Sequence, residues 1–282
     1  MQSLCDVLES MEYPGRFLMI GQTKDQNEIV AIYGITSRSK ENQARKLVVN
    51  KIIDCGQNIG LEVNVQASNQ ELMEQSADRD NLVYSAMIFN KGIVVGNGVQ
   101  TSTVAEHLDD FKRPTDSIMR GHSSHIYEPD SASTPRISAA IDLCRSNKKF
   151  SIGIIKKCNV EQKEAFKSIF EYQFVPEQGV FISTYSGKND SPPPSFVGDP
   201  IIAKIPGDNL VQTAYRIYNS LAPERAREAA KGRGDFRVSV ACLYYNPFKL
   251  KVSISIVNRK ETNPSSITFS KRDNVWYEDP KG

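Results

Sequence analysis

The stretch from Arg16 to Tyr33 reads RFLMIGQTKDQNEIVAIY, which is two apolar runs separated by a polar turn. The runs Arg16–Gly21 and Glu28–Tyr33 contain the apolar and aromatic residues that are typical of buried strands. The six residues between them are polar and suit a turn. The sequence therefore predicts a hairpin of two antiparallel strands near the start of the chain.

The same pattern returns further along the chain. A second hairpin is predicted from Leu82–Asn90 and Ile93–Gly96, which meet at Lys91-Gly92. A third is predicted from Arg237–Tyr245 and Lys249–Val257. Further strands are expected at Phe150–Lys156, Val180–Tyr185 and Ile201–Ile205.

Helical spacing of apolar residues is found in three segments. It predicts helices over Arg136–Arg145 (opened by Thr134-Pro135), Val160–Tyr172 and Asn209–Leu221. Many strands in hairpins with few amphipathic helices indicate an α+β protein, in which helices cover antiparallel sheets.

Composition excludes several classes of protein. The 282 residues carry 35 basic and 33 acidic side chains, and a net charge of +2 argues against a general nucleic-acid or membrane-surface binder. The chain contains no apolar run of the roughly 18 to 20 residues that a membrane helix needs, and its start does not resemble a signal peptide. The five cysteines are widely spaced without a C-x-x-C pair, so we expect neither a disulfide framework nor a structural zinc site, and a cytoplasmic location.

Two polar segments follow predicted strands. Tyr33–Ser39 ends in hydroxyl side chains around Arg38, whose planar fork suits phosphate or carboxylate recognition. In Asn97–Thr101, the Asn97-Gly98 step permits a positive φ, and the side chains of Asn97, Gln100 and Thr101 could read a polar heterocycle. From composition alone, an ordinary polar turn is the favoured interpretation of either segment.

A third segment, Tyr127–Arg136, places Glu128 and Asp130 ahead of the expected helix. Ser133 or Thr134 would cap that helix, and Arg136 would lie in its first turn. The helix dipole disfavours a cation there, so Arg136 either has an anionic partner or faces solvent.

In order along the chain, these segments resemble the archaeal-type inosine monophosphate (IMP) cyclohydrolase family. The resemblance is carried by Tyr13–Leu18, Ala31–Tyr33, Thr36–Ser39, Asn97-Gly98, Asp130 and Thr134–Ile137. It implies a fold similar to that of N-terminal nucleophile hydrolases, a four-layer αββα sandwich of two antiparallel sheets between helical layers. We expect residues 13–282 to form one such domain, with residues 1–12 as an extension ahead of it.

The resemblance also implies an activity and its residues. The reaction closes 5-formamidoimidazole-4-carboxamide ribonucleotide to IMP with loss of water, and needs neither metal nor cofactor. By resemblance, Tyr84, Glu128 and Arg38 are expected to be catalytic, with Tyr33, Asn97, Thr101 and Arg136 binding the substrate. Arg38 and Arg136 both remain candidates for the 5′-phosphate. The expected partner is a small purine ribonucleotide rather than nucleic acid or membrane, and the family implies a homo-oligomer.

Two other functions fit the same residues. An amide hydrolase of the same fold would cut an external C–N bond, and an N-terminus processed to Cys5 would support it. A non-catalytic protein that binds purine nucleotides would retain the site without the chemistry.

Overall fold

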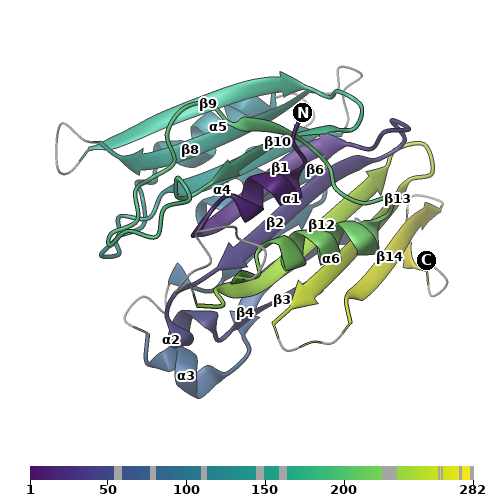
Figure 1. Cartoon of the computed structure of the whole chain (residues 1–282). Coiled ribbons are helices and arrows are strands. Elements are labelled where there is room, and N and C mark those ends of the chain that lie inside the picture. The colour runs from purple at the N-terminus through teal and green to yellow at the C-terminus, as the bar shows by residue number, and fades with distance from the viewer. Residues whose placement is uncertain are drawn as a thin grey trace.

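Two antiparallel sheets form the centre of the protein (Figure 1). The computed structural model describes residues 1–53, 59–76, 81–108, 113–143, 149–158, 164–223, 234–259, 261, 263–272 and 275–279. Within these residues, one sheet has eight strands in the order β11 (Ile201–Lys204), β10 (Gln178–Ser183), β1 (Arg16–Gln22), β2 (Ile29–Thr36), β12 (Arg237–Asn246), β13 (Lys251–Asn258), β14 (Ser265–Arg272) and β15 (Val275–Glu278). The other has seven, β3 (Arg45–Ile53), β4 (Ile59–Ala67), β5 (Tyr84–Phe89), β6 (Gly92–Gly96), β7 (Arg136–Asp142), β8 (Lys149–Lys157) and β9 (Ala165–Gln173).

Alternate residues of the central strands serve two different cores. In β1, Leu18 and Ile20 belong to a large apolar cluster that also contains Val63 and Met87 of the seven-stranded sheet. This cluster lies between the two sheets and joins their inner faces. Because side chains alternate along a strand, the intervening residues of β1, such as Met19, face outward and join a separate cluster.

Helices cover the outer faces. α1 (Leu4–Glu9) and α6 (Leu210–Ser220) pack on the eight-stranded sheet and lie in front of it in Figure 1. α4 (Gln100–Glu106) and α5 (Pro114–Ser123) pack on the outer face of the seven-stranded sheet. Two short helices, α2 (Lys40–Gln43) and α3 (Gln70–Glu74), contact each other beside β3 and β4. In the described part of the chain, every helix is too short or too polar to cross a membrane.

The α+β class and the two antiparallel sheets are confirmed. β1 with β2, β5 with β6, and β12 with β13 form the three predicted hairpins. The strands expected near Phe150, Val180 and Ile201 are present, and so is the helix over Asn209–Leu221, as α6. β3, β4, β14 and β15, and all helices except α6, were not predicted from the sequence.

Two predicted helices are wrong. Arg136–Arg145 forms strand β7 as far as Asp142, and its last two residues lie outside the described residues. β7 is buried along its whole length, and Ile137, Ala140 and Ile141 match helical spacing by coincidence. Val160–Tyr172 contains most of strand β9, and its first four residues lie outside the described part. β9 carries apolar side chains on both faces, Phe170 toward the other sheet and Ile169 toward the helices.

Candidate active site

Polar side chains gather where several strands of both sheets begin. Arg16, Arg45, Tyr84 and Arg136 are the first residues of β1, β3, β5 and β7, and all four are buried. Glu128 reaches the same region from the loop between α5 and β7. Because neighbouring strands are antiparallel, every second strand of a sheet runs in the same direction. The first residues of β3, β5 and β7 therefore lie at the same end of their sheet. Charged groups from distant parts of the sequence therefore meet in a region with little water.

Glu128 is the carboxylate of this cluster and is only 2% exposed. Its Oε2 accepts a hydrogen bond from Nη2 of Arg16, and its Oε1 accepts one from Nδ2 of Asn97 at 3.4 Å. Burial raises the pKa of Glu128, and the guanidinium groups of Arg16 and Arg136 only partly offset this rise. A carboxyl group with a raised pKa can exchange a proton closer to neutral pH than an exposed one.

A pair of phenols lies near the guanidinium of Arg16, the partner of Glu128. The hydroxyl groups of Tyr33 and Tyr84 are 2.6 Å apart, so one donates a hydrogen bond to the other. Burial first, and then the neighbouring Tyr84, raise the pKa of Tyr33 well above its usual range. Tyr33 therefore keeps its proton at neutral pH. When Tyr33 is the donor of this bond, Tyr84 can give its own proton to another group.

The amides of Asn97 and Gln100 fix the position of Arg136. Oδ1 of Asn97 accepts hydrogen bonds from the Ile137 backbone amide at 2.6 Å and from Nε2 of Gln100 at 3.2 Å. Oε1 of Gln100 in turn accepts one from Nη1 of Arg136 at 3.1 Å. Nε of Arg136 donates to the carbonyl of Ile126 at 2.8 Å. The prediction that Arg136 lies in a helix is wrong, because Arg136 begins strand β7. Its guanidinium nevertheless has polar partners, which are Gln100 and the Ile126 carbonyl.

The Asn97-Gly98 step differs from expectation. The φ of Gly98 is not in the left-handed region, so the turn does not require glycine for its backbone angles. A Cβ on Gly98 would lie 2.4 Å from Nη1 of Arg136. Glycine is thus needed here because the guanidinium packs directly on the backbone.

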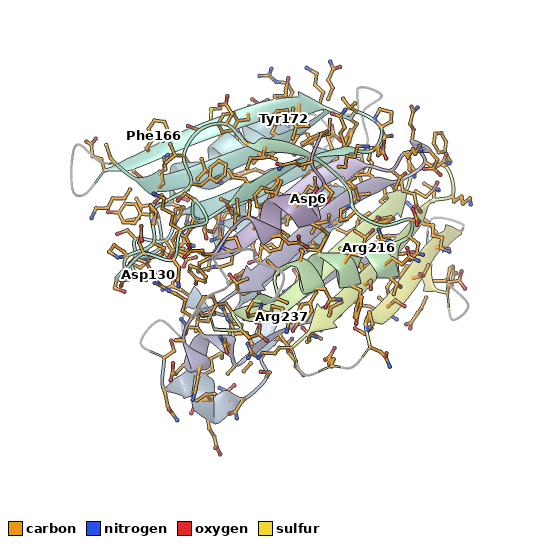
Figure 2. The ribbon with its side chains drawn as sticks, in the orientation of Figure 1. Asp6, Asp130, Phe166, Tyr172, Arg216 and Arg237 are labelled. Carbon is orange, nitrogen blue, oxygen red and sulfur yellow. The ribbon has the colours of Figure 1, made fainter. Side chains whose placement is uncertain are left out.

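The outer edge of the site is a stack of aromatic rings. The ring of Tyr13 stacks on that of Tyr185, with centroids 5.4 Å apart. The guanidinium of Arg38 lies 5.0 Å from the centroid of the same Tyr13 ring. The hydroxyl of Tyr185 is 2.6 Å from Oγ1 of Thr134. Thr134 also binds Asp130, which Figure 2 shows in the loops at one end of the sandwich. Thr134 is therefore a loop residue held by Asp130 and not the helix cap that we expected.

The candidate residues chosen from the sequence fall into three groups. Five lie together in the cluster: Tyr33, Tyr84, Asn97, Glu128 and Arg136. Arg38 is exposed at the edge, where its Nη1 donates to the carbonyl of Asp190 at 2.7 Å. Thr101 is buried in the first turn of α4 and donates to the carbonyl of Gly98 at 2.7 Å, so its hydroxyl is used within the helix.

Sequence reasoning missed Arg16 and Arg45 as site residues. Arg16 opens an otherwise apolar strand that is buried along its whole length. Arg45 follows a short helix and opens β3. A single charge at the start of an apolar run is the signal that could have indicated Arg16. For Arg45, the basic neighbour Lys46 hides any comparable signal.

The two histidines near the end of α5 bond outside this cluster. His122, a buried residue of α5, has Nε2 3.0 Å from Oγ of Ser138, and His125 has Nε2 3.1 Å from the hydroxyl of Thr103. Among the described residues, no three His, Cys, Asp or Glu side chains come together as a metal site would require.

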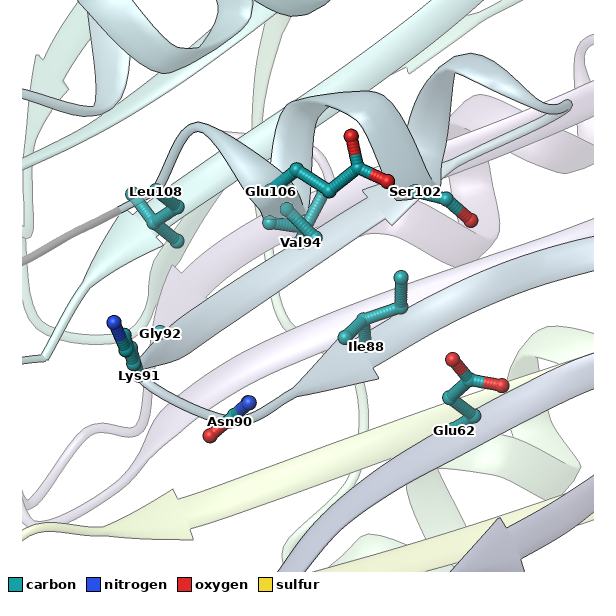
Figure 3. A pocket seen from close by; sticks show the side chains of 10 residues that line it. Glu62, Ile88, Asn90, Lys91, Gly92, Val94, Ser102, Glu106 and Leu108 are labelled. Carbon is teal, nitrogen blue, oxygen red and sulfur yellow. The ribbon is translucent and has the colours of Figure 1, made fainter. Parts of the chain in front are cut away.

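A separate cavity of about 350 Å³ opens between α4 and the β5–β6 hairpin (Figure 3). Ile88 and Val94 line it from the helix-covered face of the seven-stranded sheet, whereas Tyr84 and Val95 face the other sheet. This cavity is therefore on the opposite side of the sheet from the buried cluster.

The cluster has the parts of an acid–base site for an anionic small molecule. It combines a carboxyl group of raised pKa, a phenol pair and the guanidinium groups of Arg16, Arg45 and Arg136. These cations outnumber Glu128 and the nearby Asp130, so the site favours a ligand of negative charge.

The chain matches the model of the IMP cyclohydrolase-like protein family over residues 13–233 and belongs to that family. An IMP cyclohydrolase of Methanocaldococcus jannaschii is 30% identical over 131 residues, which are 46% of this chain and 57% of that protein. The corresponding protein of Methanopyrus kandleri is 29% identical over 46% of this chain and 59% of its own length. The matched part thus spans less than two thirds of these two relatives. An IMP cyclohydrolase of Haloquadratum walsbyi is 24% identical over 82% of this chain and 98% of its own.

A crystal structure of a Silicibacter pomeroyi protein covers 92% of this chain and 79% of its own at 14% identity, with a TM-score of 0.24. That likeness is too low to assign a fold. The family resemblance seen in the sequence is confirmed by the family match and the three archaeal relatives.

Proposed function

We propose that this protein is an IMP cyclohydrolase, which closes 5-formamidoimidazole-4-carboxamide ribonucleotide to IMP and releases water. Membership of the IMP cyclohydrolase-like family supports this activity. The main structural support is a buried cluster at one end of the sheets. In it, Glu128 accepts hydrogen bonds from Arg16 and Asn97, and the phenol pair lies near Arg16.

The chemistry of the reaction explains why such a cluster suits it. The attacking carboxamide nitrogen is a weak nucleophile because its lone pair is delocalised into the carbonyl. The formyl carbon belongs to the same molecule, so holding the two arms together removes much of the barrier. No bond between enzyme and substrate has to form. The site must only orient the arms and move protons.

We assign the proton transfers to Glu128 and Tyr84. Glu128 accepts a proton from the carboxamide nitrogen as this nitrogen bonds to the formyl carbon, and Tyr84 gives its proton to the formyl oxygen. The hydroxyl so formed then leaves as water with the proton from Glu128. The former formamide nitrogen returns a proton to Tyr84, which completes the double bond. Each residue ends in its starting state.

The two arginine candidates take different tasks in this proposal. Arg38 is exposed at the edge of the site, where a 5′-phosphate can keep part of its hydration, and we assign the phosphate to it. Arg136 is buried beside Glu128, and we assign it to the charge that develops at the reacting oxygen. Asn97 then acts by holding Glu128 and Arg136. Thr101 is the weakest of the substrate-binding candidates, because its hydroxyl is bonded within α4.

We further propose the four-layer fold of N-terminal nucleophile hydrolases, with residues 13–282 as one domain. Helices on both outer faces of the paired sheets support it. Residues 1–12 carry α1, whose Leu4 and Leu8 are buried against the eight-stranded sheet, so this extension adds to one helical layer. The proposed cytoplasmic location rests on the widely spaced cysteines, and the proposed homo-oligomer rests on the family resemblance.

The rival amide hydrolase finds less support. Its nucleophile would be Cys5, which lies in α1 on the helical side of the eight-stranded sheet, away from the phenol pair between the sheets. Burial raises the pKa of the Cys5 thiol to about 11, so the thiolate is scarce at neutral pH.

A spectrophotometric assay tests the proposed activity. Purified protein is incubated with the formylated ribonucleotide without added metal, and IMP formation is followed. We expect turnover, and we expect Tyr84→Phe and Glu128→Gln to reduce kcat by roughly two orders of magnitude while IMP still binds.

Tyr244→Phe is the matched control, because its buried hydroxyl bonds Thr213 outside the cluster. It should keep wild-type kcat. IMP binding without turnover by the wild-type protein would instead establish the non-catalytic nucleotide-binding protein, and wild-type kinetics of both site variants would refute the assigned residues.

A further inference from the structure

Within the part of the chain that the structure describes, Arg45 is a buried cation without a counterion. Its side chain is 2% exposed, its Nε donates to the carbonyl of Asn42 at 2.6 Å, and its buried Nη1 has no hydrogen-bond partner. Among the described residues, no carboxylate lies within ion-pair distance of its guanidinium. Such a charge destabilises the folded protein unless something compensates it.

The groups around Arg45 do not supply that compensation in the resting protein. Burial lowers the pKa of Arg45, and the positive charge of Arg16 lowers it further. The other titratable neighbours are the phenols of Tyr84, Tyr33 and Tyr13, of which Tyr84 interacts most strongly with the guanidinium. A phenol compensates a cation only when it carries a negative charge. The position is therefore costly at rest and favourable once Tyr84 has lost its proton.

We propose that Arg45 is a positioning residue that stabilises the phenolate of Tyr84 during turnover. This role rests on the proposed cyclohydrolase activity. When the O–H bond of Tyr84 breaks, its proton goes to the formyl oxygen and the electron pair stays on the phenol oxygen. The negative charge then lies near the guanidinium of Arg45 and the hydroxyl of Tyr33, which is 2.6 Å from the Tyr84 oxygen and can donate a hydrogen bond to the phenolate. The charge disappears when the former formamide nitrogen returns a proton.

Burial distinguishes this role from phosphate binding. A dianionic phosphate needs several donors and room for three oxygens, and Arg38 at the exposed edge offers better access than Arg45. Arg45 is instead buried near Tyr84 and Tyr33, and we propose that it acts through Tyr84. Pre-set charges of this kind stabilise a transition state without reorganisation.

Two substitutions at Arg45 test the role. Arg45→Met keeps much of the length and removes the charge, whereas Arg45→Lys keeps the charge. With the formylated ribonucleotide, we expect Arg45→Met to lower kcat about 10- to 100-fold with KM and the IMP dissociation constant within threefold of wild type. Arg45→Lys should recover most of the lost kcat. The melting temperature of Arg45→Met should stay the same or rise, since a buried unpaired charge has been removed.

Each other result contradicts the role in a recognisable way. Wild-type kcat for Arg45→Met would refute it alone, because turnover would still support the cyclohydrolase. A tenfold or larger loss of affinity for IMP but not for inosine would make Arg45 a phosphate ligand. A lower melting temperature with equal loss of kcat in both variants would make it structural. Absence of turnover in the wild-type protein would refute the proposed activity, and this role with it.

Discussion

At the scale of single residues, part of the site consists of side chains whose polar atoms already bond other groups of the protein. Asn97 shows this most clearly. Its Oδ1 accepts from the Ile137 amide and from Gln100, and its Nδ2 donates to the Pro135 carbonyl at 2.9 Å and to Glu128. An amide so occupied holds neighbouring groups in place and has little capacity left for a ligand.

The identity of the Asn97 amide should therefore matter for stability as well as for activity. Asn97→Asp keeps the shape but turns the Nδ2 donor into an oxygen that faces the Glu128 carboxylate and the Pro135 carbonyl. We expect the free energy of unfolding to fall by about 2–4 kcal/mol, the cost of buried polar groups without partners beside a like charge. Urea denaturation measures the change. Asn90→Asp, in the exposed turn of the β5–β6 hairpin, is the control, and an equal loss in both variants would contradict this account.

At the scale of helices and strands, local patterns predicted three hairpins but missed others, such as the pairs β3 with β4 and β14 with β15. The pair β1 and β2 is contiguous in sequence and joined by a polar turn, so its pairing can be read locally. β7 has neighbours β6 and β8 and is buried on both faces, which removes the alternation that identifies a strand. Arg45 was missed for a related reason. Only the meeting of two sheets, decided by contacts far apart in sequence, shows that the start of β3 is buried.

The link between β6 and α4 gives a prediction at this scale. The backbone at Gly98 lies against the side chains of Arg136 and Gln100. A Cβ added to Gly98 would lie 2.4 Å from Nη1 of Arg136 and 2.7 Å from Oε1 of Gln100, and both atoms are at the ends of flexible side chains. Flexible ends can move, so Gly98→Ala should displace Arg136 without unfolding the protein. We expect kcat/KM to fall about tenfold or more, since a displaced guanidinium no longer stabilises the reacting oxygen.

The melting temperature is the second measurement for this variant, and it should change little. Ser102→Ala, in the same helix α4, is the control and should leave both quantities unaltered. Unchanged kcat/KM in Gly98→Ala would show that the position of Arg136 does not limit the reaction.

At the scale of the whole molecule, the packing of α5 on the seven-stranded sheet makes stability depend on pH. His122 lies 1% exposed in this layer, where its Nε2 meets Ser138 and its Nδ1 is buried without a hydrogen-bond partner. Burial lowers the pKa of His122 to about 3, and the positive charge of Lys167 contributes to the shift. Lys167 itself donates to the His122 carbonyl at 2.6 Å, so this charge is fixed beside the ring.

The direction of the effect follows from where the proton binds. The unfolded chain protonates His122 near its ordinary pKa of about 6.5, whereas the folded protein resists protonation down to about 3. Between these values the unfolded state binds more protons, so acidification favours unfolding, by up to about 1.4 kcal/mol per pH unit for this one group. Above pH 6.5 the histidine is neutral in both states and contributes no dependence.

Urea denaturation at pH 7 and at pH 5 measures this contribution. The stability of the wild-type protein should fall over that interval by roughly 2 kcal/mol more than that of His122→Asn, in which the ionisable ring is gone. His125→Asn is the control. His125 is also shifted to a lower pKa by burial but is more exposed, so its removal should change the slope much less. Equal slopes in wild type and His122→Asn would mean that the layer of α5 opens to water before the sheets do, and that the buried ring titrates without unfolding the molecule.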